Sequence, residues 1–297
     1  MAKILKKKNK IDRIEGKSKN MKVQYQNTHI TVFESALFRT TTSLIVTDDL
    51  VLLVDPNWLP IEIEFIQKAV SKVKGNKPLY LLFTHSDYDH IIGYEAFPTA
   101  TIIASEAFVN NPNKDTILQQ IRDFDDEYYI KRPYLTTYPQ VDIVIREDGQ
   151  ELKIGKTILH FYLAPGHNID GIFTILPQQE LWIAGDYLSN IEFPYIYHSS
   201  IDYEKTLGQI ATFFEKYAIE VMVTGHGDVA LTQEEIQTRA KDSLAYIREL
   251  RQCVKVGKTF DFDKLMQQYA FPKIMKKFHD ANVELMRKEK GENLFPK

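Results

Sequence analysis

The stretch LYLLFTHSDYDHIIG, residues 79–93, joins an apolar run to a group of metal-capable side chains. Its first half is continuously apolar, which is typical of a strand buried on both faces of a sheet. The run stops at Thr84, and the next six residues contain four potential metal ligands: His85, Asp87, Asp89 and His90. We therefore predict a divalent-metal site where this strand ends, with the backbone fixed by the sheet and the side chains at its open edge.

Three later fragments repeat one form, in which an apolar strand is followed by a glycine and then by a ligand-type residue. They are LAPGHNIDG with His167 (163–171), LWIAGDY with Asp186 (181–187) and VMVTGHGD with His226 (221–228). Each fragment alone is a weak signal for a metal site. Their order after the first stretch is what makes the set specific.

The four fragments together resemble the metallo-β-lactamase superfamily of hydrolases, with its HxHxDH motif, third histidine, bridging aspartate and last histidine. The resemblance covers roughly residues 21–230. It implies an α/β fold, a four-layer αββα sandwich of the metallo-β-lactamase type, and two divalent metal ions. One ion would be held by His85, Asp87 and His167, and the other by Asp89, His90 and His226. Asp186 would bridge the two ions, and Asp89 and Asp186 are the implied catalytic residues.

The chain departs from the family pattern at Asp87, where the motif has histidine. Aspartate is shorter and a harder ligand, and with Asp89 and Asp186 it brings three negative charges to two ions where the family brings two. This favours iron or manganese over zinc and makes bound water less acidic. The flavodiiron branch of the superfamily has a glutamate at this position. The alternative is that Asp87 is too short to reach, which leaves a one-metal or altered site.

The resemblance implies a metal-dependent hydrolase in which two ions lower the pKa of a shared water from about 15.7 towards about 7. The resulting metal-bridging hydroxide would act on a small ester, thioester, lactone or phosphodiester. No protein nucleophile is needed, and the sequence has no serine or cysteine elbow motif. Two alternatives stay open. One is a dinuclear iron protein that handles oxygen or nitric oxide at a flavodiiron-like site, and the other is a non-catalytic binding protein on the same scaffold.

The segment after Asp186, YLSNIEFPYIYHSS (187–200), is rich in aromatic and hydroxyl side chains. In the family this segment borders the active site, so the candidate substrate contacts are Tyr187, Tyr195, Tyr197 and His198. Asp55 follows the apolar run VLLV and matches a family aspartate that supports the metal site from behind its ligands. Asp55 fits equally well as the cap of a helix after Pro56.

Composition indicates a soluble globular protein. The chain has 297 residues, 44% of them hydrophobic and 26% charged, and no apolar run approaches the ~20 residues of a membrane helix. Its single cysteine, Cys253, excludes an intramolecular disulfide and a cysteine-based zinc cluster and is expected to be a structural thiol. The basic amino terminus lacks the apolar stretch of a secretory signal. These features favour the cytoplasm and a small-molecule substrate, with no membrane span.

Charge divides the chain into a short arm and a body. Residues 1–20 hold eight Lys or Arg against two acidic residues, a net of +6, which leaves −9 for residues 21–297 of a chain whose total is −3. We expect a mobile basic arm and a single domain over 21–297. The alternative for the arm is contact with nucleic acid or an anionic membrane, but the acidic body argues against a polyanionic substrate, so no nucleic acid is expected.

Periodicity outlines the elements of the domain. Strand patterns fill residues 21–56, helical spacing covers 61–73 and 202–217, and further helices are expected from about 231. The region around 107–140 resembles a family insertion, and it is either a lid or a helix packed on the sandwich. Three histidines without a motif are expected to be packed or edge residues: His29, His160 and His279. The oligomeric state is left open.

Overall fold

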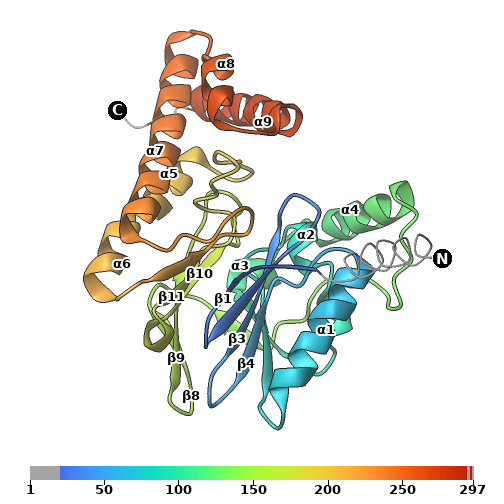
Figure 1. The fold of residues 1–297 in the computed structure, drawn as a ribbon. Helices are drawn as coiled ribbons and strands as arrows, with labels where there is room; N and C mark the ends of the chain where they lie inside the picture. The colour runs from blue at the N-terminus through green and yellow to red at the C-terminus, as the bar shows by residue number, and fades with distance from the viewer. Residues whose placement is uncertain (1–20, 293–294, 296–297) are drawn as a thin grey trace, which may run out of the picture.

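Two β-sheets packed face to face form the centre of the protein, with helices on both outer sides (Figure 1). The computed structural model describes residues 21–292 and residue 295. In that part of the chain the first sheet has seven strands, in the order β1 (Lys22–Gln26), β2 (Ile30–Glu34), β3 (Thr41–Val46), β4 (Val51–Val54), β5 (Leu79–Leu82), β6 (Thr101–Ser105) and β7 (Ile143–Ile145). The second sheet has five, in the order β12 (Val221–Val223), β11 (Leu181–Ile183), β10 (Ile172–Leu176), β9 (Thr157–Leu163) and β8 (Gln150–Ile154). This is the αββα sandwich that the resemblance implied.

Parallel pairing brings the ends of several strands to one edge of the sandwich. In the first sheet β1 to β4 pair antiparallel, whereas β4 to β7 pair parallel. In the second sheet β8 to β11 pair antiparallel, and β11 pairs parallel with β12, with Leu181 opposite Val221. Because parallel neighbours end on the same side, the segments that follow β11 and β12 emerge next to each other.

Alternate side chains of β5 enter different cores. Leu82 lies in the core between the two sheets, whereas Leu81 lies in the outer core beneath α1 (Pro60–Lys74). Both faces of this strand are therefore covered, which explains why the run before Thr84 is apolar throughout. Burial of each such leucine stabilises the fold by about 1.5–3 kcal/mol.

The helices on the side of the second sheet come from the carboxyl-terminal half of the chain. They are α5 (Ser200–Gly208), α6 (Ile210–Lys216) and α7 (Gln233–Val256), followed by α8 (Phe262–Leu265) and α9 (Pro272–Gly291), which lie beside α7 and away from the strands (Figure 1). The helix expected over 202–217 is divided at Gln209, directly after Gly208, a residue of low helix propensity. The Thr232 hydroxyl caps α7 by accepting a hydrogen bond from the Glu235 amide at 3.1 Å, and Gly257 ends the helix with a φ of 72°. The long α7 and α9 match the helices predicted from about 231.

The region around 107–140 forms helices that pack on the first sheet. They are the short α3 (Glu106–Val109), which follows β6, and α4 (Lys114–Glu127), which contacts α2 (Tyr88–Ile91). The Phe124 ring lies 4.9 Å from the Trp58 ring, and Arg132 joins the Asp125 carboxylate to the Trp58 carbonyl. This geometry fits the packed-helix alternative, and its effect is to fix the position of Trp58.

The histidines without a motif lie away from the strand ends that carry the ligands. His29 is exposed, and His160 lies in β9 with its Nδ1 3.3 Å from the Glu151 carboxylate. His279 is buried in α9 beside Tyr246. None of the helices within residues 21–292 is long and apolar enough to cross a membrane. The basic arm, residues 1–20, lies outside the described residues.

Candidate metal centre

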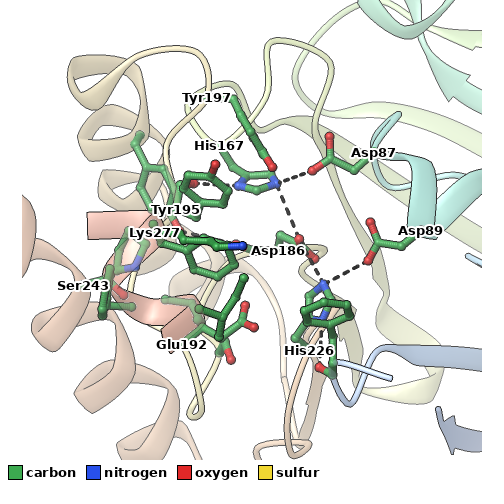
Figure 2. Close-up of a pocket in the computed structure, with 18 of the residues that line it drawn as sticks. Asp87, Asp89, His167, Asp186, Glu192, Tyr195, Tyr197, His226, Ser243 and Lys277 are labelled. Atoms are coloured by element: carbon green, nitrogen blue, oxygen red, sulfur yellow. Dashed lines mark hydrogen bonds and ion pairs between the residues drawn. The ribbon is translucent and has the colours of Figure 1, made fainter. Parts of the chain in front are cut away.

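The seven predicted ligands meet at the edge where strands of both sheets end. Figure 2 shows those that face the pocket: Asp87, Asp89, His167, Asp186 and His226. His85 follows β5, and Asp87 to His90 lead into α2 and form its first turn. His167 follows β9, Asp186 follows β11 and His226 follows β12. Side chains that are up to 141 positions apart in the sequence are therefore brought together by strand ends, as the four fragments predicted.

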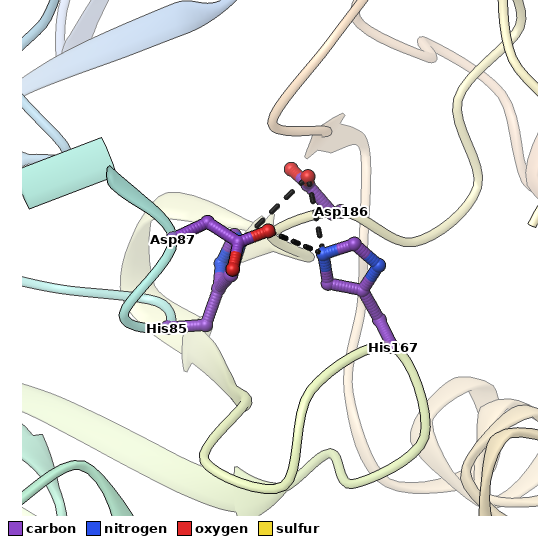
Figure 3. A group of neighbouring side chains, drawn as sticks. All are labelled: His85, Asp87, His167 and Asp186. Atoms are coloured by element: carbon purple, nitrogen blue, oxygen red, sulfur yellow. Dashed lines mark hydrogen bonds and ion pairs between the residues drawn. The ribbon is translucent and has the colours of Figure 1, made fainter. Parts of the chain in front are cut away.

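The first cluster consists of His85, Asp87, His167 and Asp186, whose candidate ligand atoms all lie within 4.8 Å of one another (Figure 3). His167 Nε2 lies 3.2 Å from Asp87 Oδ2 and 3.4 Å from Asp186 Oδ2. His85 Nε2 lies 3.6 Å from the same two oxygens. Asp87 therefore points into the cluster and lies on its inner side, although its side chain is shorter than the histidine of the family motif.

The second cluster consists of Asp89, His90 and His226, again with ligand atoms within 4.8 Å of one another. Asp186 also contacts this cluster, because its Oδ1 lies 3.2 Å from His90 Nε2 and its Oδ2 lies 3.3 Å from His226 Nε2. The Asp186 carboxylate thus lies between the two groups of histidines. This is the position that a bridging ligand requires.

The inner atoms of the clusters are short of hydrogen bonds. Within the described residues, three buried atoms of the clusters have no hydrogen-bond partner of acceptable geometry: His85 Nε2, His90 Nε2 and Asp186 Oδ1. A buried polar atom left without a partner costs about 1–3 kcal/mol, so such atoms are rare unless they serve a ligand. Imidazole nitrogens and carboxylate oxygens are the donors that zinc, iron and manganese accept. The two clusters are therefore compatible with binding metal ions.

Asp55 orients the first and last histidines of the first motif, His85 and His90. Its Oδ2 lies 3.0 Å from His90 Nδ1 and accepts a 2.5 Å hydrogen bond from the Thr84 hydroxyl, which in turn lies 3.0 Å from His85 Nδ1. Because the Thr84 proton is used on Asp55, the His85 Nδ1 proton donates to Thr84, and its Nε2 lone pair faces the cluster. The helix-cap alternative for Asp55 is wrong, since α1 begins at Pro60 with Leu59 as its N-cap.

Backbone carbonyls orient the other two histidines. His167 Nδ1 lies 2.7 Å from the Tyr195 carbonyl oxygen, and His226 Nδ1 lies 3.0 Å from the Phe38 carbonyl oxygen. A carbonyl only accepts, so each Nδ1 carries the proton and each Nε2 presents its lone pair inward. All four histidines therefore have the same tautomer.

Electrostatics favour positive charge at the centre of both clusters. Burial alone would lower the pKa of His167, but Asp87 and Asp186 raise it to about 9. Burial would raise the pKa of Asp186, but His226, His90 and His85 hold it well below its ordinary value. A field that holds a proton on a buried histidine also favours a cation at the same place.

Glycine at the tips of β11 and β12 is required by space and by backbone conformation. A Cβ on Gly225 would lie 1.9 Å from Asp186 Oδ1 and 2.9 Å from the His90 ring. Gly185 has a φ of 52°, in the left-handed region that glycine adopts without a steric penalty. The repeated strand–glycine–ligand form of the sequence is thus explained by close packing around Asp186.

A pocket of about 240 Å³ opens onto the two clusters (Figure 2). Its wall is mainly aromatic and apolar, and it includes Phe38, Trp58, Tyr88, Leu188, Phe193, Pro194, Tyr195, Tyr197, Tyr203, Ile274 and Phe278. The polar side chains outside the clusters are Ser189, Glu192, Ser243 and Lys277. Burial raises the pKa of Glu192, and Asp186 and Asp89 add to the effect. Such a wall suits a small organic molecule with few polar groups.

Two of the four predicted substrate contacts line this pocket. Tyr197 lies with its ring 5.3 Å from the His167 ring, and Tyr195 stacks on Phe278 at 4.1 Å. Tyr187 is buried behind the wall, where its hydroxyl donates to the Pro165 carbonyl at 2.9 Å. His198 faces Asp202 at 3.6 Å. Tyr187 and His198 therefore lie outside the pocket wall, because their polar atoms serve the neighbouring loop and helix.

Helix α9 holds the segment that carries Tyr195, a feature with no sequence signal. The buried Asn282 accepts a hydrogen bond from the Ile196 amide at 2.9 Å and donates to the Pro194 carbonyl at 2.7 Å. These bonds flank Tyr195, whose own carbonyl orients His167. Near the other end of α9, the buried Glu289 accepts from the Ser200 amide at 2.8 Å. Ordinary polar residues in an amphipathic helix gave no sign of either contact.

Comparison with known proteins places the chain in a family. Residues 36–226 match the family model of the metallo-beta-lactamase superfamily, and no curated protein matches the chain. Among solved structures, a stereoselective inverting sec-alkylsulfatase from Pseudomonas sp. is similar over 93% of this chain, with 14% identity and a TM-score of 0.60. The match covers 52% of that enzyme, so the chain spans about half its length.

Two further solved structures agree with the fold. A metallo-beta-lactamase family protein from Thermus thermophilus is similar over 91% of this chain and 92% of its own, with 16% identity and a TM-score of 0.57. A metallo-beta-lactamase from Pontibacter korlensis is similar over 77% of this chain and 99% of its own, with 17% identity and a TM-score of 0.51. At such low identity these likenesses show the fold alone. From the family match and the geometry of its strand ends, the chain belongs to the metallo-beta-lactamase superfamily.

Proposed function

We propose that the protein is a metal-dependent hydrolase that binds two divalent ions and cleaves a small ester, thioester, lactone or phosphodiester. The observation that carries the proposal is the position of Asp186, whose carboxylate oxygens lie 3.2–3.4 Å from histidines of both clusters. A carboxylate shared in this way brings two ions into one site, which suits hydrolysis without a protein nucleophile.

The residues of the two clusters would hold the metal ions. In the first cluster His85, Asp87 and His167 would hold one ion, and in the second Asp89, His90 and His226 would hold the other. Asp186 would bridge them. Bound zinc, iron or manganese would polarise a carbonyl or phosphoryl oxygen and acidify water. The three carboxylates favour the harder iron or manganese over zinc.

The pocket wall supports a small organic substrate. Rings such as Trp58, Tyr195 and Phe278 exclude water from the space beside the clusters and bind the carbon skeleton. Tyr197 lies against His167 in the pocket wall, and we expect it to contact a substrate beside the first cluster. We propose the reducing cytoplasm as the location, because Cys253 is the single cysteine of the chain.

A panel of hydrolysis assays on metal-loaded protein tests the proposal. The panel holds 4-nitrophenyl esters, an acyl thioester, lactones and bis(4-nitrophenyl) phosphate, with a secondary alkyl sulfate added because one solved neighbour is an alkylsulfatase. We expect at least one class to be cleaved, with the activity lost on chelation and restored by metal. The Asp186→Ala variant is the control for adventitious metal catalysis. Turnover that survives both chelation and Asp186→Ala would contradict the proposal.

A second candidate is a dinuclear iron protein that handles oxygen or nitric oxide. It is favoured by the carboxylate of Asp87, which lies 3.2 Å from His167 Nε2 and stands at position 87, where the family motif has a histidine. Carboxylate-rich sites favour iron. Iron analysis of protein purified without air, followed by an oxygen-consumption assay, separates this candidate from the hydrolase. Oxygen consumption without hydrolysis would favour the iron protein.

A further inference from the structure

Lys277 is the one Lys or Arg among the residues that line the pocket in the described part of the chain. It lies on α9, outside residues 36–226, which match the family model. Figure 2 shows its side chain extending from the helix toward the middle of the pocket. The pocket therefore has a positive group that the superfamily's shared framework does not supply.

In the described part of the chain, the Lys277 ammonium is not paired with a carboxylate. Within residues 21–292 the structure gives Lys277 no ion pair within 4.0 Å, although Glu192 lines the same pocket. Its neighbour Lys276 differs, because its ammonium pairs with Asp280 on the outer side of the same helix. The charge of Lys277 thus remains available to a molecule in the pocket.

The backbone of α9 that carries Lys277 is held relative to the two clusters, while the lysine side chain itself is exposed at the pocket. The next residue, Phe278, stacks on Tyr195 at 4.1 Å, and Asn282 holds the backbone on both sides of Tyr195. The Tyr195 carbonyl in turn contacts His167. An ammonium on such a helix can select substrates by the distance between their charged group and the bond that lies at the clusters.

We propose that Lys277 binds a carboxylate of the substrate while the scissile bond lies at the two clusters, so that the substrate is a small ester, thioester or lactone with a free carboxylate. The inference rests on the proposed function and adds the substrate class. Apolar rings between the two ends, such as Tyr195 and Phe278, contact the connecting carbon chain. Without Lys277 an anionic substrate would meet Glu192 in a body of net charge −9.

A matched pair of esters tests the inference. The anionic probe is mono(4-nitrophenyl) glutarate, and the neutral probe is 4-nitrophenyl valerate, which has the same acyl length. For Lys277→Ala we expect kcat/KM for the glutarate ester to fall about tenfold, mainly through KM, with the valerate value within about twofold. Lys277→Arg should keep most of the preference. The control is Lys273→Ala, a lysine one turn earlier on α9 that is exposed like Lys277 but, unlike it, does not line the pocket.

A binding measurement keeps the inference separate from the proposed function. Both tryptophans are buried, but Trp58 lines the pocket and Trp182 does not, so quenching of tryptophan fluorescence reports entry of a ligand beside Trp58. We expect 3-phenylpropionate to bind more tightly than 3-phenylpropionamide. Lys277→Ala should lower the ratio of the two Kd values (amide over carboxylate) about tenfold, and Lys273→Ala should leave this ratio unchanged. If neither ester is cleaved, the binding result decides the inference and the assay panel decides the function. Equal ratios in Lys277→Ala and Lys273→Ala would overturn the role of Lys277.

Discussion

The two clusters share Asp186, and Asp55 supports one histidine of each, but His226 and His167 are held by different parts of the molecule. In the second cluster His90 is oriented by the carboxylate of Asp55, and His226 by the carbonyl of Phe38. All of these residues lie within 36–226, the part that matches the family model. In the first cluster His167 is oriented by Tyr195, whose segment is held by Asn282 of α9, beyond that match.

The difference shows where the individual properties of this chain arise. The second cluster keeps the family ligands, and the partners that orient its histidines, Asp55 and Phe38, both lie within the family match. The first cluster contains Asp87, the one ligand position that departs from the family motif, and its His167 is oriented by a segment that α9 holds. Because α9 also carries Lys277 and Phe278, we infer that metal preference and substrate choice are both set on the first-cluster side of the pocket.

Asp186→Ala should have the largest effect, because both clusters lose a shared ligand at once. We expect activity to fall on the order of 10³-fold or more, which corresponds to several kcal/mol of lost stabilisation of the transition state. Excess metal should rescue His226→Ala better than Asp186→Ala. The test is a metal titration of activity in both variants, and equal rescue would argue that Asp186 does not bridge.

Asp87→Ala separates a ligand role for this carboxylate from a bystander role. If Asp87 is a ligand, metal affinity and turnover should each fall on the order of 10²-fold, because the carboxylate that faces His167 is gone. Asp87→His restores the family motif and should shift metal preference towards zinc. Competition between zinc and manganese, followed by elemental analysis, measures the shift. Unchanged occupancy and turnover in Asp87→Ala would favour the one-metal alternative.

Asp55→Asn should act mainly on the second cluster, because Asp55 contacts His90 directly and reaches His85 of the first cluster only through Thr84. The amide keeps the shape of the carboxylate but loses its charge, so we expect about tenfold weaker metal binding at the second cluster. Stepwise calorimetric titration resolves the two sites. A loss confined to the first cluster would contradict the assignment of Asp55 to His90.

Asn282→Leu should act on the first cluster, with the smallest effect of the set. Leucine keeps the approximate size of asparagine but removes both bonds that flank Tyr195, so the His167 ring loses part of its orientation. We expect about threefold to tenfold weaker binding at the first cluster and none of this loss at the second. Glu289→Gln, which weakens the other anchor of α9, is the matched control. If both variants weaken the two clusters equally, α9 acts only through general stability.

The sequence was informative where function depends on strand ends. The apolar run before Thr84 predicted a strand covered on both faces, and residues 79–93 together with the three strand–glycine–ligand fragments predicted the seven side chains that converge. The contribution of α9 could not be predicted, because Lys277 and Asn282 lie about 50 residues or more beyond the last fragment and are ordinary residues of an amphipathic helix. Tyr187 and His198 have aromatic side chains in the right segment, but their polar atoms contact Pro165 and Asp202 outside the pocket wall.

Metal content tests the central claim, that the two clusters form one dinuclear site, most directly. Protein expressed with supplemented zinc, iron or manganese and kept from chelators should hold about two transition-metal equivalents per chain by elemental analysis. Asp186→Ala, prepared in parallel, should hold clearly fewer. A content near zero in the unaltered protein, or equal content in the two proteins, would contradict a dinuclear site bridged by Asp186.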